Sequence, residues 1–428
     1  MTLHTLKTRP EEDRECCGGS NLLPIDTAIA KGLALATPLA GFETVSLYGA
    51  RGRTMAGDIH AFMPLPNFNN SAMDGYAINT DCLSGKPPYR LKITGRMAAG
   101  DPDTNSAHET PTGTLRILTG AAVPANYNAV IMQEKVRVED DHILFDHCPD
   151  VGRNIRPAGE DCRPGDLIVG AGTLLASHHI AILAAQGISE IPVKRKVRVA
   201  IFSTGSELAL PGQTLKSGQI FNSNRYALAS QLDQPFIEII DLGTIKDDYQ
   251  VLKETTAAAA EMADMVITTG GVSVGDEDHM PGIVTDLGGK LHVMKVAIKP
   301  GKPVTVGTIG DCIFLGLPGN PVAAFVNQIL IGRAIISKLS GQASQALASY
   351  LASYPAIARF ERKRSAARQE YVPARIVGKN QQGSPVVEAF EKAGSATLLP
   401  LANSDGFIVL PVGMAQVKSG DVLEFIPH

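Results

Sequence analysis

The chain has 428 residues, of which 44% are hydrophobic and 19% charged, and its formal net charge is −4. This length is too great for one compact core and predicts about two to four domains of roughly 100–200 residues. The weak negative charge argues against a nucleic-acid or membrane partner, although a local basic cluster can still bind a small anion. The longest apolar stretch, residues 321–336, is interrupted by Asn327, Gln328 and Arg333 and falls short of the ~20 residues that span a membrane.

The six cysteines contain no CxxC pair, which argues against a structural zinc site. Their sparse use suits the reducing cytoplasm. Residues 1–21 lack the apolar segment of a signal peptide and are predicted to form a flexible tail. We assign no role to the adjacent Cys16 and Cys17 in that tail.

The first predicted helix begins near Asp26, and another covers residues 176–187. Between them lie short β-like runs separated by Gly, Pro and Asn turns, at residues 89–98, 113–121, 128–134 and 142–147. We therefore predict a β-rich domain, residues 61–149, inserted into a discontinuous elongated domain formed by residues 22–60 and 150–190.

From residue 191 onward, strands alternate with helices. Strands are predicted at 197–205, 236–245, 264–271 and from 312, and helices at 222–232, 247–263 and 321–336. This alternation predicts an α/β domain, residues 191–342, whose parallel-type sheet is covered on both faces. Residues 343–428 return to short β runs, which fit a small β-barrel or sandwich.

Three strand ends of the α/β domain lead into glycine-rich loops, at residues 203–208, 268–279 and 316–321. Ligands of such sheets bind beyond the carboxyl ends of the strands, and glycine lets the backbone offer N–H groups to a phosphate. Each loop alone can be a simple tight turn. Three at one sheet edge favour a phosphate-bearing or nucleotide-like ligand, and the candidate binding residues are Ser203, Thr204, Gly205, Gly270, Gly271, Ser273, Gly275, Gly319 and Asn320.

Carboxylates lie in or beside the same loops, among them Glu207, Asp247 and Asp278. Mg²⁺ prefers one or two carboxylates together with phosphate oxygens, so Glu207 and Asp278 are candidate metal ligands. The carboxylates can also accept hydrogen bonds from an amino-heterocycle such as a pterin. For Asp247, a plain helix cap is an equal alternative.

A basic cluster of Lys295, Lys299 and Lys302 lies between two of the glycine loops. These lysines suit an oxyanion such as phosphate or molybdate, and a solvated lysine surface is the alternative. Because they alternate with apolar residues, not all of them can share one face of a strand.

The ordered motifs of the chain resemble those of the MoeA family, the molybdopterin molybdenumtransferases, which includes the gephyrin E-domain. The matching segments, which together extend over residues 22–428, are NSAMDGYA, LTGAAVPANYNAVIMQE, GRNIRPAGED, VRVAIFSTGSEL, GQIFNSNR, TTGGVSVGDEDH, AIKPGKPV and GLPGNPVAA. The resemblance implies an elongated domain, an inserted β domain, a MogA-like α/β molybdopterin-binding domain and a C-terminal β-barrel. It also implies a homodimer whose active cleft lies between the α/β domain of one subunit and the inserted β domain of the other.

The implied reaction consumes adenylylated molybdopterin and molybdate, requires a divalent cation, Mg²⁺, and releases AMP. The resemblance also implies contacts with molybdopterin adenylyltransferase and with acceptor molybdoenzymes. Positions matching the family's catalytic residues are Asp74, Thr119, Arg156, Glu207, Asp278, Lys295 and Lys299, and further cofactor-binding positions are Asp247, Pro318, Pro321 and Ser395. The sequence does not separate molybdenum from tungsten.

Two positions depart from the family pattern. Asn69 and Ser206 stand where relatives often have aspartate, so a charged acceptor is replaced by a neutral one and metal affinity is expected to be weaker if either position binds magnesium. Two other functions stay open. An adenylyltransferase would need only the α/β domain, and a non-catalytic scaffold would bind the pterin without turnover.

Overall fold

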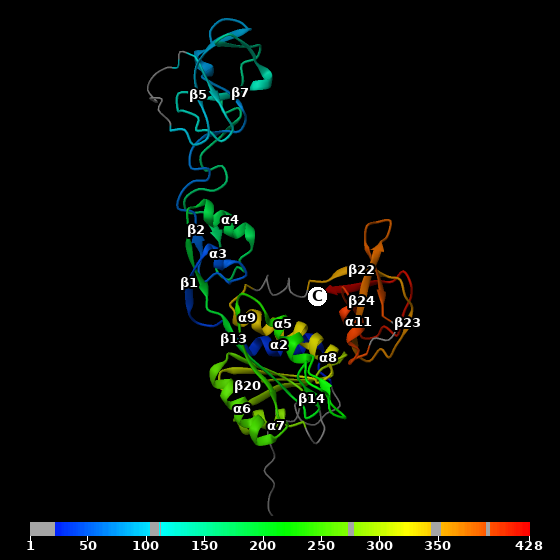
Figure 1. Cartoon of the computed structure of the whole chain (residues 1–428). Coiled ribbons are helices and arrows are strands. Elements are labelled where there is room, and N and C mark those ends of the chain that lie inside the picture. Colours follow the sequence, from blue (N-terminus) through cyan, green and yellow to red (C-terminus); the bar gives the residue numbers. More distant parts are fainter. Residues whose placement is uncertain (1–21, 103–110, 112, 273–277, 344–351, 391–393) are drawn as a thin grey trace, which may run out of the picture. The chain divides into compact units, whose positions relative to one another are not determined.

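The computed structural model describes residues 22–102, 111, 113–272, 278–343, 352–390 and 394–428. Contacts divide the chain into two compact units (Figure 1). The first comprises residues 1–57, 171–176 and 191–428, and the second comprises residues 58–170 and 177–190. The α/β sheet and the C-terminal barrel belong to the first unit, and the inserted β domain belongs to the second.

A six-stranded sheet forms the centre of the α/β domain, with strand order β16-β13-β17-β21-β20-β18. The first four strands are parallel, as predicted, and β20 and β18 are antiparallel at one edge. This edge pair was not predicted, because Lys290, His292 and Lys295 interrupt the apolar pattern of β18. The strands are β13 (Val197–Thr204), β16 (Ile237–Ile245), β17 (Met265–Thr269), β18 (Lys290–Lys295), β20 (Pro303–Ile309) and β21 (Cys312–Leu317).

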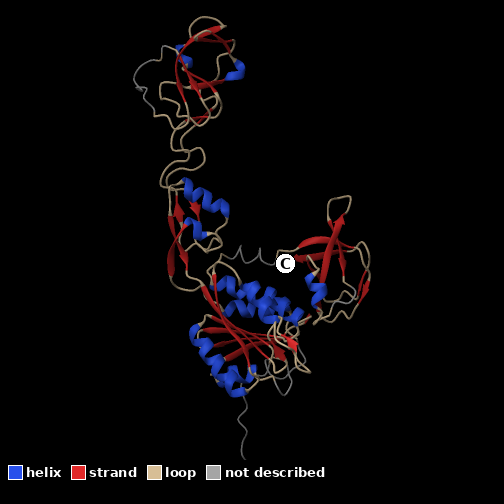
Figure 2. Ribbon diagram, in the orientation of Figure 1, coloured by secondary structure: helices blue, strands red, loops and turns tan. Residues whose placement is uncertain are grey.

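Helices cover both faces of this sheet (Figure 2). In β13, Val199 and Ile201 point to one apolar cluster, whereas Ala200 and Phe202 point to the other. Both faces are therefore buried, which explains the nearly continuous apolar run of this strand. One face packs against α2 (Ile25–Leu35), α5 (Asn224–Leu232), α8 (Pro321–Asn327), the π-helical segment η4 (Gln328–Gly332) and α9 (Arg333–Leu339), and the other against α6 (Tyr249–Met262) and α7 (Met280–Asp286).

Helix α2 packs against α9, η4 and β18 of the α/β domain, although residues 22–60 were predicted to belong to the elongated domain. The close approach depends on Gly32, where an added Cβ would lie 2.9 Å from Cδ1 of Ile335. The amphipathic pattern of α2 predicted a buried face and did not specify which domain would cover it.

Residues Pro321–Leu339 form the one described helix long and apolar enough to cross a membrane, but 83% of its most apolar stretch is buried within the fold. It runs through α8, η4 and α9 without a break. Its apolar character is therefore accounted for by packing against the sheet and α2.

The C-terminal domain is a closed β-barrel in which β24 pairs with both β25 and β26. The strand order β24-β25-β22-β28-β26 closes back on β24 and confirms the barrel. The short strand β19 pairs with β24 and so joins the α/β domain to the barrel. The elements are β19 (Ile298–Lys299), β22 (Tyr354–Ala358), β23 (Arg362–Lys363), β24 (Gln369–Lys379), β25 (Pro385–Ala389), α11 (Leu398–Ala402), β26 (Gly406–Leu410), β27 (Gln416–Val417) and β28 (Val422–Pro427).

The second unit contains a six-stranded sheet of order β7-β4-β6-β5-β9-β8, which matches the predicted β runs. The elements of the whole second unit are β2 (Ile59–His60), β3 (Asn70–Ser71), β4 (Gly75–Ile78), η2 (Thr80–Cys82), β5 (Tyr89–Met97), β6 (Thr114–Ile117), β7 (Ala129–Met132), η3 (Gln133–Lys135), β8 (Arg137–Glu139), β9 (His142–Phe145), β10 (Ile155–Arg156), β11 (Leu167–Val169) and α4 (Ser177–Ala185). The remaining short elements are β1 (Phe42–Ser46), α3 (Leu47–Ala50), β12 (Glu190–Lys194), β14 (Leu208–Ala209) and β15 (Ile220–Phe221).

Candidate active site

The three glycine-rich loops meet at the carboxyl ends of β13, β17 and β21. The Ser203 and Thr269 hydroxyls lie 2.8 Å apart across β13 and β17. An added Cβ at Gly270, whose φ is +95°, would lie 2.4 Å from the Thr204 carbonyl oxygen, so only glycine allows this approach. Gly270 also lies against Gly319. Parallel strands bring these loops together because their carboxyl ends share one edge of the sheet.

Two carboxylates lie at the end of β13. The Glu207 carboxylate folds against Gly205, where an added Cβ would lie 2.6 Å from Oε2 of Glu207. Asp247 accepts a hydrogen bond of 3.0 Å from the Thr204 hydroxyl. The cap of α6 is Asp248, whose carboxylate accepts from the Val251 amide, so Asp247 is free of that role.

Asp278 is half-buried and lies two residues before the start of α7. Ser273 and Gly275, which precede it in the same loop, lie outside the described residues. Ser206 is exposed in the turn between Gly205 and Glu207.

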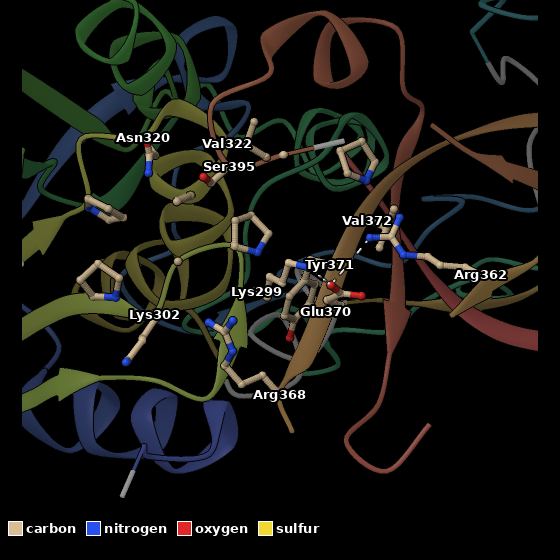
Figure 3. Close-up of a pocket in the computed structure, with 17 residues that line it drawn as sticks. Lys299, Lys302, Asn320, Val322, Arg362, Arg368, Glu370, Tyr371, Val372 and Ser395 are labelled. Atoms are coloured by element: carbon tan, nitrogen blue, oxygen red, sulfur yellow. Dashed lines mark ion pairs between the residues drawn. The ribbon is translucent and has the colours of Figure 1, made fainter. Parts of the chain in front are cut away.

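A cavity of 280 Å³ lies between the α/β domain and the barrel (Figure 3). Five of the positions named from the sequence line it: Lys299, Lys302, Pro318, Asn320 and Ser395. The Val322 amide donates a hydrogen bond of 3.0 Å to the Ser395 carbonyl, which fixes the barrel loop to the start of α8. Arg362 and Arg368 add further cations to Lys299 and Lys302, and Glu370 contributes one carboxylate. The excess of cations suits an oxyanion.

The Glu370 carboxylate organises these cations from a position that is only 4% exposed. Nζ of Lys299 lies 2.6 Å from Oε1, and Nη2 of Arg362 lies 3.7 Å from the same oxygen. Nε of Arg364, which is only 2% exposed, lies 3.0 Å from Oε2. Figure 3 shows Lys299 and Arg362 approaching Glu370 from opposite sides.

The strand-end loops and the cationic cavity meet at one short segment. Gly319 lies against Gly270. Its carbonyl accepts a hydrogen bond of 2.7 Å from the side-chain amide of Asn224. The neighbouring Pro318 and Asn320 line the cavity. The strand-end loops therefore lie beside the cationic cavity. Lys295 lies at the end of β18 and is not among the residues that line this cavity.

The second unit brings together the other predicted motifs. Asp74 accepts two hydrogen bonds of 2.7 Å, one from the amide and one from the hydroxyl of Thr119. Arg156 lies opposite Asn70 in the antiparallel pairing of β10 with β3, and its side chain is exposed. Oδ1 of Asn69 accepts a hydrogen bond of 2.8 Å from the Ala158 amide, so the neutral side chain serves as an acceptor for the backbone.

The Thr119 contacts have an electrostatic consequence. Its backbone N–H, followed by its hydroxyl, holds the pKa of the Asp74 carboxyl below the usual value. We expect Thr119→Val, which keeps the N–H and deletes the hydroxyl, to raise the pKa of Asp74 toward that value. The contact is stabilising above the unfolded-state pKa and is lost as pH falls through the folded one. A pH titration of the ¹³C carboxyl resonance measures the shift, and an unchanged midpoint would contradict the assignment.

Sequence reasoning missed Arg362, Arg364, Arg368 and Glu370. They lie in the barrel, about 60 residues beyond the lysine cluster, in a segment without a local motif. The one sequence feature that could have indicated them is the high proportion of arginine and lysine in residues 359–368. The pairing of β19 with β24 is what brings them to Lys299.

Three family profiles match successive parts of the chain. They describe the MoeA N-terminal region (domain I and II) at residues 23–187, a probable molybdopterin binding domain at residues 200–337 and the MoeA C-terminal region (domain IV) at residues 355–428. A molybdopterin molybdenumtransferase of Haemophilus influenzae is 35% identical over 408 residues, which cover 95% of this chain and 98% of that protein. The chain belongs to the molybdopterin molybdenumtransferase (MoeA) family. It is therefore a transferase.

Two further similarities support membership in the MoeA family. A molybdopterin molybdenumtransferase of Nostoc sp. is 36% identical over 392 residues, covering 89% of this chain and 88% of that protein. The crystal structure of the molybdopterin biosynthesis MoeA protein from Pyrococcus horikoshii superimposes with a TM-score of 0.80 at 28% identity, covering 95% of this chain and 100% of that one. The family resemblance read from the ordered motifs is confirmed.

Proposed function

We propose that this transferase inserts molybdenum from molybdate into adenylylated molybdopterin, cleaving the adenylyl group and releasing AMP, as a step of molybdenum cofactor biosynthesis in the cytoplasm. The observation that carries the proposal is the segment Pro318–Asn320, which belongs both to the strand-end loops and to the cationic cavity. The reaction joins a phosphate-bearing pterin to an oxyanion, molybdate. It therefore needs two adjoining binding sites, and the strand-end loops and the cationic cavity adjoin at this segment.

The strand-end loops supply the site for adenylylated molybdopterin. Gly270 and Gly271 have φ values of +95° and +66°, so the backbone rather than side chains faces the ligand. The hydroxyls of Ser203 and Thr204 are fixed by Thr269 and Asp247. These paired hydroxyls hold the loop backbone in shape, so it can meet a phosphate with little reorganisation.

The cationic cavity supplies the site for molybdate. Lys299, Lys302, Arg362 and Arg368 surround it, and Ser395 adds a polar group from the barrel. Glu370 keeps Lys299 in place and lowers the net positive charge. Cations held around the cavity in this way can bind the dianion beside the neighbouring pterin site.

The carboxylates at the end of β13 fit a magnesium ion shared with the substrate. Mg²⁺ keeps several waters and takes one or two protein carboxylates beside phosphate oxygens. Glu207 and Asp247 lie at this strand end, and Asp278 precedes α7 on the neighbouring loop. Within the described residues no group of three or more acidic, His or Cys side chains is arranged to hold a metal ion, so the ion would depend on substrate oxygens. Bound there, it would neutralise phosphate charge.

A homodimer would give the exposed Asp74, Thr119 and Arg156 of the inserted β domain a role. In that arrangement the partner subunit's inserted domain faces the strand-end loops, and its arginine adds positive charge. Molybdopterin adenylyltransferase and acceptor molybdoenzymes would be its protein partners. The alternative function, an adenylyltransferase, needs only the α/β domain. It would therefore not explain the barrel or the 280 Å³ cavity that the barrel helps to form.

The test combines purified protein with adenylylated molybdopterin, Mg²⁺ and molybdate and follows AMP release together with pterin-bound molybdenum. Molybdate-dependent AMP release with metal incorporation supports the transferase. Tight binding of an adenylylated pterin that stays intact would instead favour the scaffold.

Gly270→Ala tests the loop cluster. Its Cβ would meet the Thr204 carbonyl at 2.4 Å, so the loop must move. We expect the Kd for adenylylated molybdopterin to rise at least about tenfold, because fixed N–H donors are displaced. Gly288→Ala is the matched control, since its φ of +77° imposes similar backbone strain while its Cβ meets nothing within 4 Å. Equal affinities for the two variants in calorimetric titrations would refute the role of Gly270.

A further inference from the structure

Tyr249, the first residue of α6, contacts both ends of the short helix α7. The two helices pack side by side on one face of the sheet (Figure 1). At the start of α7, the Tyr249 ring meets the His279 ring edge-on, with the ring centroids 5.5 Å apart. At its end, the Tyr249 hydroxyl donates a hydrogen bond of 2.8 Å to Oδ2 of Asp286. One side chain therefore holds α7 at both ends.

The middle of α7 also lies close to this tyrosine, since an added Cβ at Gly282 would be 3.7 Å from the Tyr249 hydroxyl oxygen. The bond to Asp286 raises the pKa of Tyr249 and lowers that of Asp286, so the hydroxyl stays the donor and the carboxylate the acceptor. Tyr249 is 37% exposed and belongs to neither apolar cluster of the sheet. Its contacts therefore serve the placement of α7 rather than the packing of the core.

Two candidate metal ligands lie beside the Tyr249–His279 contact. Asp247 precedes Tyr249 by two residues, and Asp278 directly precedes His279. Adjacent Cα atoms are about 3.8 Å apart, so a contact between the two rings keeps both carboxylates in one region at the strand ends.

A second series of contacts, through the sheet, connects Asp247 to α7. Asp247 accepts a hydrogen bond of 3.0 Å from the Thr204 hydroxyl. An added Cβ at Gly271 would lie 3.2 Å from Cγ2 of Thr204 and 3.2 Å from Cγ of Met280. The Met280 amide donates a hydrogen bond of 3.1 Å to the Gly271 carbonyl. Since Met280 begins α7, the contacts form a closed ring that returns to Asp247 through Tyr249.

We propose that Tyr249 is a positioning residue for the divalent cation of the transferase: it holds Asp278 beside Asp247, so that both carboxylates can serve one ion. The inference rests on the proposed magnesium site, and Tyr249 itself does not touch the ion. Residues that orient metal ligands in this way typically change metal affinity about 10–100-fold when they are replaced.

Mn²⁺ binding, read from the electron paramagnetic resonance signal of the free ion, tests this role without turnover. Mn²⁺ suits the same carboxylate ligands as Mg²⁺. The full chain is titrated with Mn²⁺ in the presence of adenylylated molybdopterin and without molybdate. We expect Tyr249→Leu to raise the Kd for Mn²⁺ at least about tenfold. Lys253→Met is the matched control, because Lys253 is the other partner of Asp286, at 3.3 Å, and its loss should change the Kd less than about twofold.

Two variants of His279 separate positioning from direct metal binding. His279→Ala removes the ring that meets Tyr249, so we expect the same rise in Kd as in Tyr249→Leu. The double variant should exceed either single variant by less than about twofold, because both changes remove one contact. His279→Phe keeps an aromatic ring without nitrogen ligands, and its Kd should stay within about twofold of the unaltered chain.

An unchanged Kd in Tyr249→Leu and His279→Ala would overturn the proposal. An equal loss in Lys253→Met would do so as well, since general packing of α6 on α7 would then explain the effect. If His279→Phe lost as much affinity as His279→Ala, the imidazole would be a ligand and the positioning role would be wrong. His279→Ala stays informative if Tyr249→Leu does not fold. Absence of Mn²⁺ binding by the unaltered chain is a distinct result, because it would refute the proposed magnesium site itself.

Discussion

Lys299→Ala is expected to lower kcat/KM for molybdate in the AMP-release reaction about 10²–10³-fold. Removal of one fixed electrostatic donor from a catalytic site has an effect of this order. Nζ of Lys299 is held 2.6 Å from Glu370 at the edge of the cavity and is the cation nearest that buried carboxylate. The variant also leaves Glu370 with less compensation, so the cavity becomes less attractive to a dianion.

Lys290→Ala is the matched control. Lys290 is an exposed lysine on β18 of the same domain and does not line the cavity. Its loss changes the net charge equally and should leave kcat/KM within about twofold. Similar kinetics for the two variants would mean that Lys299 belongs to a solvated surface, which was the alternative considered from the sequence.

Arg364→Met is expected to destabilise the barrel by about 3–5 kcal/mol, because it removes one partner of a buried ion pair and leaves the carboxylate behind. Arg364 and Glu370 are 2% and 4% exposed. Nη1 of Arg364 also donates to the carbonyls of Pro411 and Met414, at 3.0 and 2.7 Å. Methionine fills similar volume but makes none of these contacts. Hydrogen exchange of the β24 and β26 amides, read by mass spectrometry, measures the free energy of barrel opening.

Arg359→Met provides the comparison at the surface. Arg359 pairs with Glu388 at 2.9 Å, but the two side chains are 56% and 28% exposed. Solvent screens such a pair, so the expected change is below about 1 kcal/mol. If both arginine variants destabilised the barrel equally, the Glu370 cluster would have no special structural role.

Much of the α/β domain could be predicted because its signals are local. The run at residues 197–204 is apolar on both faces of β13, and the glycine loops follow β13, β17 and β21 directly. These loops converge because the carboxyl ends of parallel strands lie at the same edge of a sheet. The choice between a cap and a functional role for Asp247 could not be made from sequence, because Asp248 was an equally good cap.

Only some of the residues that line the cationic cavity could be predicted from the sequence. Lys299, Pro318 and Asn320 belong to recognisable motifs, whereas Arg362, Arg368 and Glu370 contribute through pairing between β19 and the distant β24. Long-range pairing of a two-residue strand leaves no periodic pattern. The position of α2 was unpredictable for a similar reason, since its amphipathic face fits any apolar surface.

The location of bound molybdenum tests the proposed transferase site most directly. A crystal of the full chain soaked in molybdate, with diffraction recorded at the molybdenum absorption edge, gives its position without reference to any assumed mechanism. We expect an anomalous peak in the cavity bounded by Lys299, Arg368 and Ser395, and we expect Lys299→Ala to abolish it. A peak elsewhere, with none in this cavity, would contradict the claim that the strand-end loops and the cationic cavity form one transferase site.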